Sequence, residues 1–117
     1  MTKFTDLDTA ILALRDAMIS DFAGYNNASS GYYNLPESYY QERLKEYAES
    51  FRIEEGRTYI KLTSNGSVKG FIVKKPTKGF KVGDMLMPAS YKAPATNFSR
   101  GNVFDGLFDR IRWTGIQ

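Results

Sequence analysis

The stretch YIKLTSNGSVKGFIVKK (residues 59–75) decides the fold. Polar and apolar residues alternate along residues 59–64 and again along residues 67–75, which is typical of β-strands. Asn65-Gly66 lies between these two runs and suits a two-residue hairpin turn, because both turn positions need a positive φ. The stretch therefore predicts a β-hairpin with Ser64 opposite Ser67.

A regular register from this turn assigns the two faces of the hairpin. It pairs Ile60 with Phe71, Leu62 with Lys69, and Thr58 with Val73. The face predicted to be core then carries Ile60, Leu62, Phe71 and Val73. The other face is mixed and carries Tyr59, Lys61, Thr63, Val68 and Ile72.

Shorter segments on either side of the hairpin extend the predicted sheet. Residues 51–54 alternate before it, and residues 80–82 and 85–87 follow it, with Pro88 as the stop signal. Residues 110–114 alternate again, with Ile111 and Trp113 on one face and Arg110 and Arg112 on the other. Residues 89–106 between them are irregular, polar and aromatic, and a loop of this length is usually functional or disordered.

The N-terminal part of the chain predicts two helices. Thr5 is a candidate N-cap, and the apolar spacing of the first helix ends near Gly24. Its apolar face consists of Leu7, Ile11, Leu14, Met18 and Phe22. Residues 25–35 resemble a loop. A second helix is expected from Pro36 to about Ser50, with Tyr40, Leu44 and Tyr47 on its apolar face.

Together these elements predict an α+β fold. Residues 1–117 form one domain, with a helical part (1–50) and a β part (51–117). We expect the two N-terminal helices to pack on a small, bent antiparallel sheet or partial barrel of four to five strands.

The composition excludes several classes of site. The chain has no cysteine and no histidine, so it has no disulfide, no thiolate nucleophile, no Ser-His-Asp triad and no imidazole metal ligand. Any catalysis would have to use carboxylates, Lys, Tyr, Ser or Thr, or a metal held by oxygen ligands. We expect no catalytic residues, no cofactor and no metal. No run of 18 apolar residues and no signal-type N-terminus is present, which predicts a cytoplasmic protein that does not contact the membrane.

Charge is distributed unevenly along the chain. Residues 1–56 hold five Lys/Arg and ten Asp/Glu, whereas residues 57–117 hold eleven Lys/Arg and three Asp. The two parts carry net charges of −5 and +8, which add to the overall +3. Such a split indicates either a polyanionic partner or electrostatic pairing within the protein, and the sequence leaves both open.

Five short segments resemble short uncharacterised accessory proteins of tailed bacteriophages. They are GFIV (70–73), FKVGD (80–84), APA (93–95), RGN (100–102) and WTG (113–115), so the resemblance covers about residues 51–117. It implies a small viral protein acting in the cytoplasm of a bacterial host. It carries no established activity or site residues with it.

The residues favour a binding protein over an enzyme. Aromatic residues make up 15% of the chain and Met85 and Met87 share a predicted strand, which is typical of a protein partner surface or a homo-oligomer. One such homodimer would place the basic sheet of one copy on the acidic helices of the other. We expect the chain to modulate a host or viral protein.

The alternative partner is a nucleic acid, single-stranded or RNA, bound by the basic C-terminal half. The candidate contact residues for a ligand or nucleic acid are Lys61, Lys69, Tyr91, Lys92, Asn97, Arg100, Asn102, Arg110 and Arg112. Residues 100–102 alone also suit a small anion. A Mg²⁺-dependent nuclease using Asp84, Asp105 and Asp109 is disfavoured, because Asp84 and Asp105 occupy ordinary turn positions.

Overall fold

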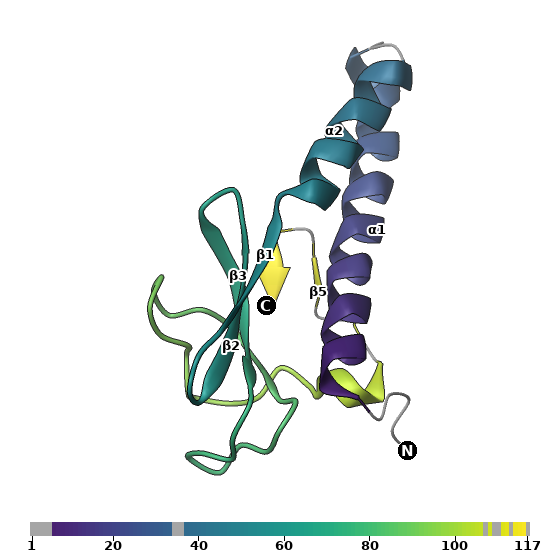
Figure 1. Cartoon of the computed structure of the whole chain (residues 1–117). Coiled ribbons are helices and arrows are strands. Elements are labelled where there is room, and N and C mark those ends of the chain that lie inside the picture. Colours follow the sequence, from purple (N-terminus) through teal and green to yellow (C-terminus); the bar gives the residue numbers. More distant parts are fainter. Residues whose placement is uncertain (1–5, 34–36, 107, 109–110, 113, 117) are drawn as a thin grey trace.

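The computed structural model describes residues 6–33, 37–106, 108, 111–112 and 114–116 of the chain. Within these residues it confirms the α+β class, with two helices followed by an antiparallel sheet (Figure 1). In chain order the elements are α1 (Leu7–Tyr33), α2 (Glu37–Glu49), β1 (Phe51–Glu55), β2 (Tyr59–Ser64), β3 (Ser67–Val73), β4 (Met85–Leu86), the 3-10 helix η1 (Val103–Asp105), β5 (Ile111–Arg112) and β6 (Gly115–Ile116).

Helix α1 is longer than the sequence predicted. Asp6 caps its N-terminus, where the Oδ2 atom accepts hydrogen bonds from the backbone N–H and the hydroxyl of Thr9. The predicted cap, Thr5, lies outside the described residues. The predicted stop at Gly24 and the loop over 25–33 are wrong, because the helix continues to Tyr33. Asn, Ser and Gly each cost about 1 kcal/mol or less in a helix, so these residues weaken the helix without ending it.

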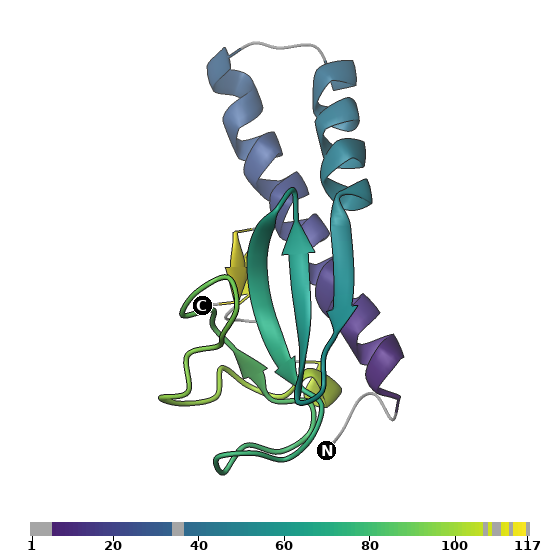
Figure 2. The same ribbon diagram turned by 60° about the vertical axis from the view of Figure 1, so that its left-hand side comes forward.

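The sheet is open and has the order β1-β2-β3-β4, with every neighbouring pair antiparallel. It is not closed, so the structure does not confirm a partial barrel. Strands β5 and β6 form a separate two-stranded sheet. Helix α1 lies across one face of the four-stranded sheet, and α2 runs beside α1 above the sheet before the chain enters β1 (Figure 2).

The predicted hairpin turn is confirmed, but its register is wrong beyond the first pairs. Asn65 and Gly66 adopt positive φ values of 52° and 77°, and Ser64 pairs with Ser67. A β-bulge then inserts Lys69 as an extra residue, so that Leu62 pairs with Gly70 and Ile60 pairs with Ile72. A one-residue shift moves every later side chain to the opposite face of the sheet.

The bulge divides the apolar residues between two clusters. Ile72, predicted on the mixed face, joins Ile60 and Leu62 in the main core. In that core the sheet packs against Ala10, Ile11, Leu14, Met18 and Phe22 of α1. Phe71 and Val73, predicted on the same face as Ile60, instead lie on the opposite face with Leu86. We call this second side, which faces away from α1, the outer face.

Candidate functional site

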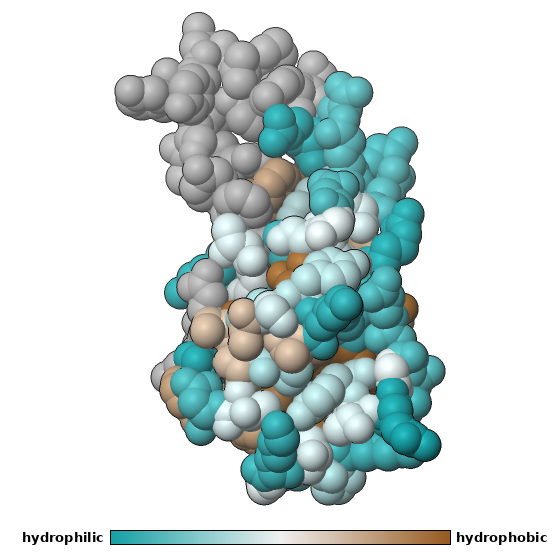
Figure 3. All heavy atoms as spheres, turned by 90° about the vertical axis from the view of Figure 1, so that its left-hand side faces the viewer, coloured by the Kyte–Doolittle hydropathy of each residue, from teal (hydrophilic) through white to brown (hydrophobic). Residues whose placement is uncertain are grey.

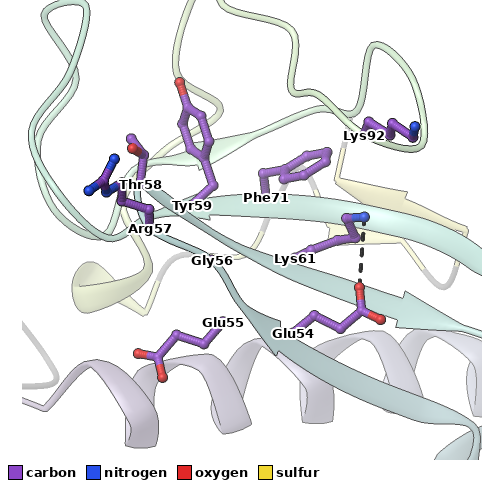
Figure 4. A pocket seen from close by; sticks show the side chains of 9 residues that line it. All are labelled: Glu54, Glu55, Gly56, Arg57, Thr58, Tyr59, Lys61, Phe71 and Lys92. Carbon is purple, nitrogen blue, oxygen red and sulfur yellow. Dashed lines mark ion pairs between the residues drawn. The ribbon is translucent and has the colours of Figure 1, made fainter.

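An open hollow of about 410 Å³ lies on the outer face near the β1–β2 connection (Figure 4). Side chains along β2 point alternately to the two faces of the sheet, and Lys61 points to the outer face and into the hollow. Phe71 also lies in the hollow, because the bulge turns that residue to the outer face. The hollow is lined by Glu54, Glu55, Gly56, Arg57, Thr58, Tyr59, Lys61, Phe71 and Lys92. In the space-filling view of this face, weakly polar and apolar side chains occupy the centre and hydrophilic ones gather toward the margins (Figure 3).

Lys61 connects the hollow to the irregular segment after β4. Its Nζ atom lies 4.1 Å from the centre of the Tyr91 ring, a cation–π contact, and 3.7 Å from Oε2 of Glu54. The Lys61 side chain is 19% exposed, whereas Tyr91 is 50% exposed. The ammonium group therefore holds one aromatic ring in place while much of that ring stays open to solvent.

A second aromatic–cation pair lies further along the same segment. The Arg100 guanidinium carbon lies 3.8 Å from the centre of the Phe98 ring, and Phe98 is 46% exposed. The Asn97 side chain accepts a hydrogen bond from the Phe98 backbone N–H at 3.0 Å. Both pairs combine an exposed ring with a positive charge.

Backbone hydrogen bonds tie this irregular segment to β4. The Arg100 N–H donates to the Met85 carbonyl, and the Met85 N–H donates to the Gly101 carbonyl, each at 2.8 Å. The Ala95 N–H donates to the Met87 carbonyl at 2.7 Å. The long irregular segment predicted from the sequence is therefore present and anchored at several points. We name residues 88–101 the anchored loop.

Asn102, a predicted contact residue, is instead part of the framework. It is 9% exposed, and its Nδ2 atom donates to the Val82 carbonyl at 3.0 Å and to Oδ1 of Asp84 at 3.1 Å. Its Oδ1 atom accepts from the Phe104 N–H at 3.0 Å. These contacts occupy the amide at both ends, so the side chain supports the end of β4 and the start of η1.

The structure brings some predicted contact residues together and separates others. Lys61, Tyr91 and Lys92 surround or border the hollow, and Asn97 and Arg100 follow on the anchored loop. Lys69 does not line the hollow; it is the bulge residue beside β6, and burial lowers the pKa of its ammonium group. Arg112 also lies away from the hollow, where it donates to the Ile111 carbonyl. Arg110 lies outside the described residues.

Sequence reasoning missed Tyr59 and Phe71 as lining residues. The regular register places Phe71 on the core face, whereas the bulge turns it to the outer face; Tyr59 shares the predicted face of Lys61 but was not among the candidate contact residues. The one available signal was Gly70, because a glycine inside a strand often marks a bulge or a close backbone approach.

Of the three aspartates of the disfavoured nuclease, the structure describes two, Asp84 and Asp105. Oδ2 of Asp84 accepts from the Lys81 N–H and its Oδ1 atom bonds Asn102, whereas Asp105 lies in η1. Asp109 lies outside the described residues. Among the residues that are described, no group of three or more acidic side chains could hold a metal ion. None of the described helices is long and apolar enough to cross a membrane.

A second, smaller groove lies between α1 and the edge strand β1. Its volume is about 220 Å³, and it is lined by Asp8, Ile11, Leu12, Ile53, Glu55 and Ile60. Leu12 and Ile53 are 40% and 45% exposed, so the groove is open and presents two large apolar side chains beside the acidic Asp8 and Glu55. It opens on the opposite side of the sheet from the hollow, since Ile53 pairs with the inward-facing Leu62.

Comparisons with protein-family models, with curated proteins and with solved structures gave no match.

Proposed function

We propose that this chain is a non-enzymatic binding protein that holds a protein partner on its outer face and anchored loop. The observation that carries the proposal is that the anchored loop presents two exposed rings, Tyr91 and Phe98. Each ring lies against a cation, either Lys61 of β2 or Arg100 of the loop. Aromatic residues and arginine are enriched at protein interfaces and among the residues that dominate binding energy.

The surroundings of these rings favour a partner with both acidic and apolar groups. Arg57 and Lys92 are exposed at the hollow, next to the half-buried Lys61. Glu54 and Glu55 are already engaged by Lys61 and Lys74, at 3.7 and 3.1 Å. Backbone hydrogen bonds hold the loop in place before a partner binds. Binding therefore costs less conformational entropy of the loop. The resemblance to tailed-phage accessory proteins supports a host or viral protein as the partner, in a bacterial cytoplasm.

A comparative capture experiment tests this proposal. The wild-type chain, a Tyr91→Ser/Phe98→Ser variant and a control variant would be immobilised and exposed to the same bacterial lysate. The control, Gln41→Ser/Lys45→Ser, changes two exposed residues of α2, far along the chain from the loop. We expect the wild type and the control to retain a partner that the loop variant loses, with an affinity at least about tenfold weaker once the partner is purified. A partner retained equally by all three would contradict the proposal.

A nucleic-acid partner is the second candidate, because Arg57, Lys61 and Lys92 lie around the same hollow as Tyr59. Cations can neutralise phosphates there while a ring stacks on an unpaired base. With Arg100 included, four cations would give a slope of log K against log salt no steeper than about −3 for a single strand. Fluorescence anisotropy with a labelled single strand measures this slope, and Lys92→Glu, compared with Lys45→Glu on α2, locates the contact. Absence of binding at low salt would eliminate this candidate.

A further inference from the structure

Strand β1 is paired on one side only within the described residues. It lies at the edge of the sheet order β1-β2-β3-β4. Just beyond β1, the Gly56 N–H donates to the Tyr59 carbonyl at 2.9 Å, and the register continues as Glu55 opposite Ile60. Hydrogen-bonded pairs alternate along an antiparallel ladder, so Glu54–Lys61 and Arg52–Thr63 are the next bonded pairs. The N–H and C=O of Ile53 therefore point away from β2, toward the open edge.

The sequence around Ile53 is complementary to itself. Arg52 and Glu54 flank Ile53 and carry opposite charges. If a second β1 runs antiparallel with the two Ile53 residues opposite each other, Arg52 of each copy faces Glu54 of the other. Charged residues on an edge strand normally prevent such pairing, because like charges meet. In this register only opposite charges meet, and the new contacts would add to those that each side chain makes in its own chain. Glu54 lies 3.7 Å from Lys61, and Arg52 donates to the carbonyls of Glu49 and Phe51.

The inner side of the same edge offers apolar surface for a second copy. The Ile53 side chain points into the groove beneath α1, where Leu12 is also exposed. Two Ile53 side chains related by a two-fold axis would lie against each other there, close to both copies of Leu12. The groove also holds two acidic residues, Asp8 and Glu55, of which Glu55 pairs with Lys74 of its own chain at 3.1 Å.

We propose that two copies of this chain associate through antiparallel pairing of their β1 strands across a two-fold axis at Ile53. The two four-stranded sheets would then form one continuous sheet. The order of charges around Ile53 favours a second copy over an unrelated strand, because two identical β1 strands already place Arg52 opposite Glu54. The charges that set this register lie on the outer face, where Glu54 also lines the hollow, whereas the pairing itself uses the backbone edge of β1 and Ile53 on the inner side. Association of two copies therefore does not require a partner in the hollow.

A charge-swap experiment tests the register directly. Sedimentation equilibrium on the purified full chain would give its mass as a function of concentration, starting from 13.3 kDa for one chain. We expect the wild type to reach twice this mass. Arg52→Glu and Glu54→Arg should each weaken association by at least roughly tenfold, because each places two like-charged pairs across the two-fold axis.

An equimolar mixture of these two variants should regain the doubled mass. In the mixed pair, the introduced glutamate of one chain faces the introduced arginine of the other. The unchanged Glu54 of the first chain faces the unchanged Arg52 of the second, so both cross-axis contacts again join opposite charges.

The double variant Arg52→Glu/Glu54→Arg supplies the matched control. It carries both changes yet restores opposite charges across the axis, so we expect it to associate like the wild type. Far-UV circular dichroism would verify folding of every variant. Should a variant fail to fold, hydrogen exchange on the wild type serves instead, and the Ile53 amide should exchange more slowly as concentration rises. A wild type that stays monomeric, or a mixture that does not regain the doubled mass, would overturn the proposal.

Discussion

At the scale of single residues, Asn102 joins segments that are distant in sequence. Its amide bonds the Val82 carbonyl, the Asp84 carboxylate and the Phe104 N–H while the side chain is almost fully buried. Asp84 in turn accepts from the Lys81 N–H, so the turn before β4 and the start of η1 share one hydrogen-bond network. Removing one member of a buried network leaves the others without partners.

We therefore expect Asn102→Ala to lower the free energy of unfolding by about 1–3 kcal/mol. Urea denaturation followed by tryptophan fluorescence measures this change. Asn97→Ala is the matched control, because Asn97 is exposed and bonds only its neighbour Phe98 in the contacts described. Equal stability of the two variants would contradict the structural role of Asn102 and return it to the candidate binding residues.

At the scale of elements, the bulge in β3 explains the largest difference between sequence and structure. Alternation along residues 59–64 and 67–73 correctly predicted two strands and their turn, because these signals are local. An extra residue in one strand leaves the alternation of each half intact, so the pattern cannot reveal the shift. The bulge matters only through tertiary packing, where it turns Ile72 toward α1 and Phe71 outward.

The same distinction between local and tertiary signals applies elsewhere. The apolar face of α1 was predictable from its spacing, whereas its continuation to Tyr33 was not, because the Asn, Ser and Gly residues there favour turns in a local sequence pattern. At the site, residue types singled out Lys61, Tyr91 and Lys92 as candidates, and the structure places these three close together. An asparagine can equally bind a partner at the surface or support the fold from a buried position, so the residue type of Asn102 does not separate the two roles. Its burial, which the sequence does not show, favours the supporting role.

The observed register makes a specific prediction for Ile72. This side chain is fully buried in the main core, so Ile72→Ala should lower the free energy of unfolding by about 2–5 kcal/mol. The control is Ile53→Ala, which removes the same atoms from a site that is 45% exposed, and its cost should be far smaller. Chemical denaturation of both variants at a concentration where the chain is monomeric provides the comparison. A tolerated Ile72→Ala would support the register without a bulge.

Strand β6 makes a second prediction at this scale, because it lies against β3 without space for a side chain at Gly115. A Cβ atom there would lie 2.6 Å from the Lys69 carbonyl oxygen, and the Gly115 φ is +135°. We expect Gly115→Ala to cost about 1–3 kcal/mol of stability. Gly79→Ala controls for the positive φ alone, since Gly79 has a φ of +84° but no neighbouring atom within 4 Å of such a Cβ. Thermal unfolding of both variants should place Gly115→Ala clearly lower.

At the scale of the whole molecule, one aromatic cluster connects the helical hairpin to the sheet. The Tyr47 ring of α2 stacks on Phe22 of α1 with centroids 4.4 Å apart, and it meets Phe51 of β1 edge-on at 5.0 Å. Tyr47 is 7% exposed. Burial, together with the nearby charge of Asp21, raises the pKa of the Tyr47 hydroxyl above its ordinary value of 10.0. The junction between helices and sheet therefore contains an ionisable group that is held neutral.

This raised pKa predicts how the stability of the molecule depends on alkaline pH. Above about pH 10 the unfolded chain releases the Tyr47 proton while the folded chain keeps it, so the unfolded state binds fewer protons. The contribution of Tyr47 to stability is thus fully present below about pH 10 and declines as the pH rises further. Tyr47→Phe keeps the stacked ring and removes the ionisable group, so this variant should lose less stability than the wild type between about pH 9 and pH 11.

Denaturation at both pH values measures the difference, with Tyr59→Phe on the outer face as the control for loss of a tyrosine hydroxyl. Identical pH dependence in the wild type and Tyr47→Phe would mean that water reaches the hydroxyl, and that the hairpin does not close against the sheet at this junction.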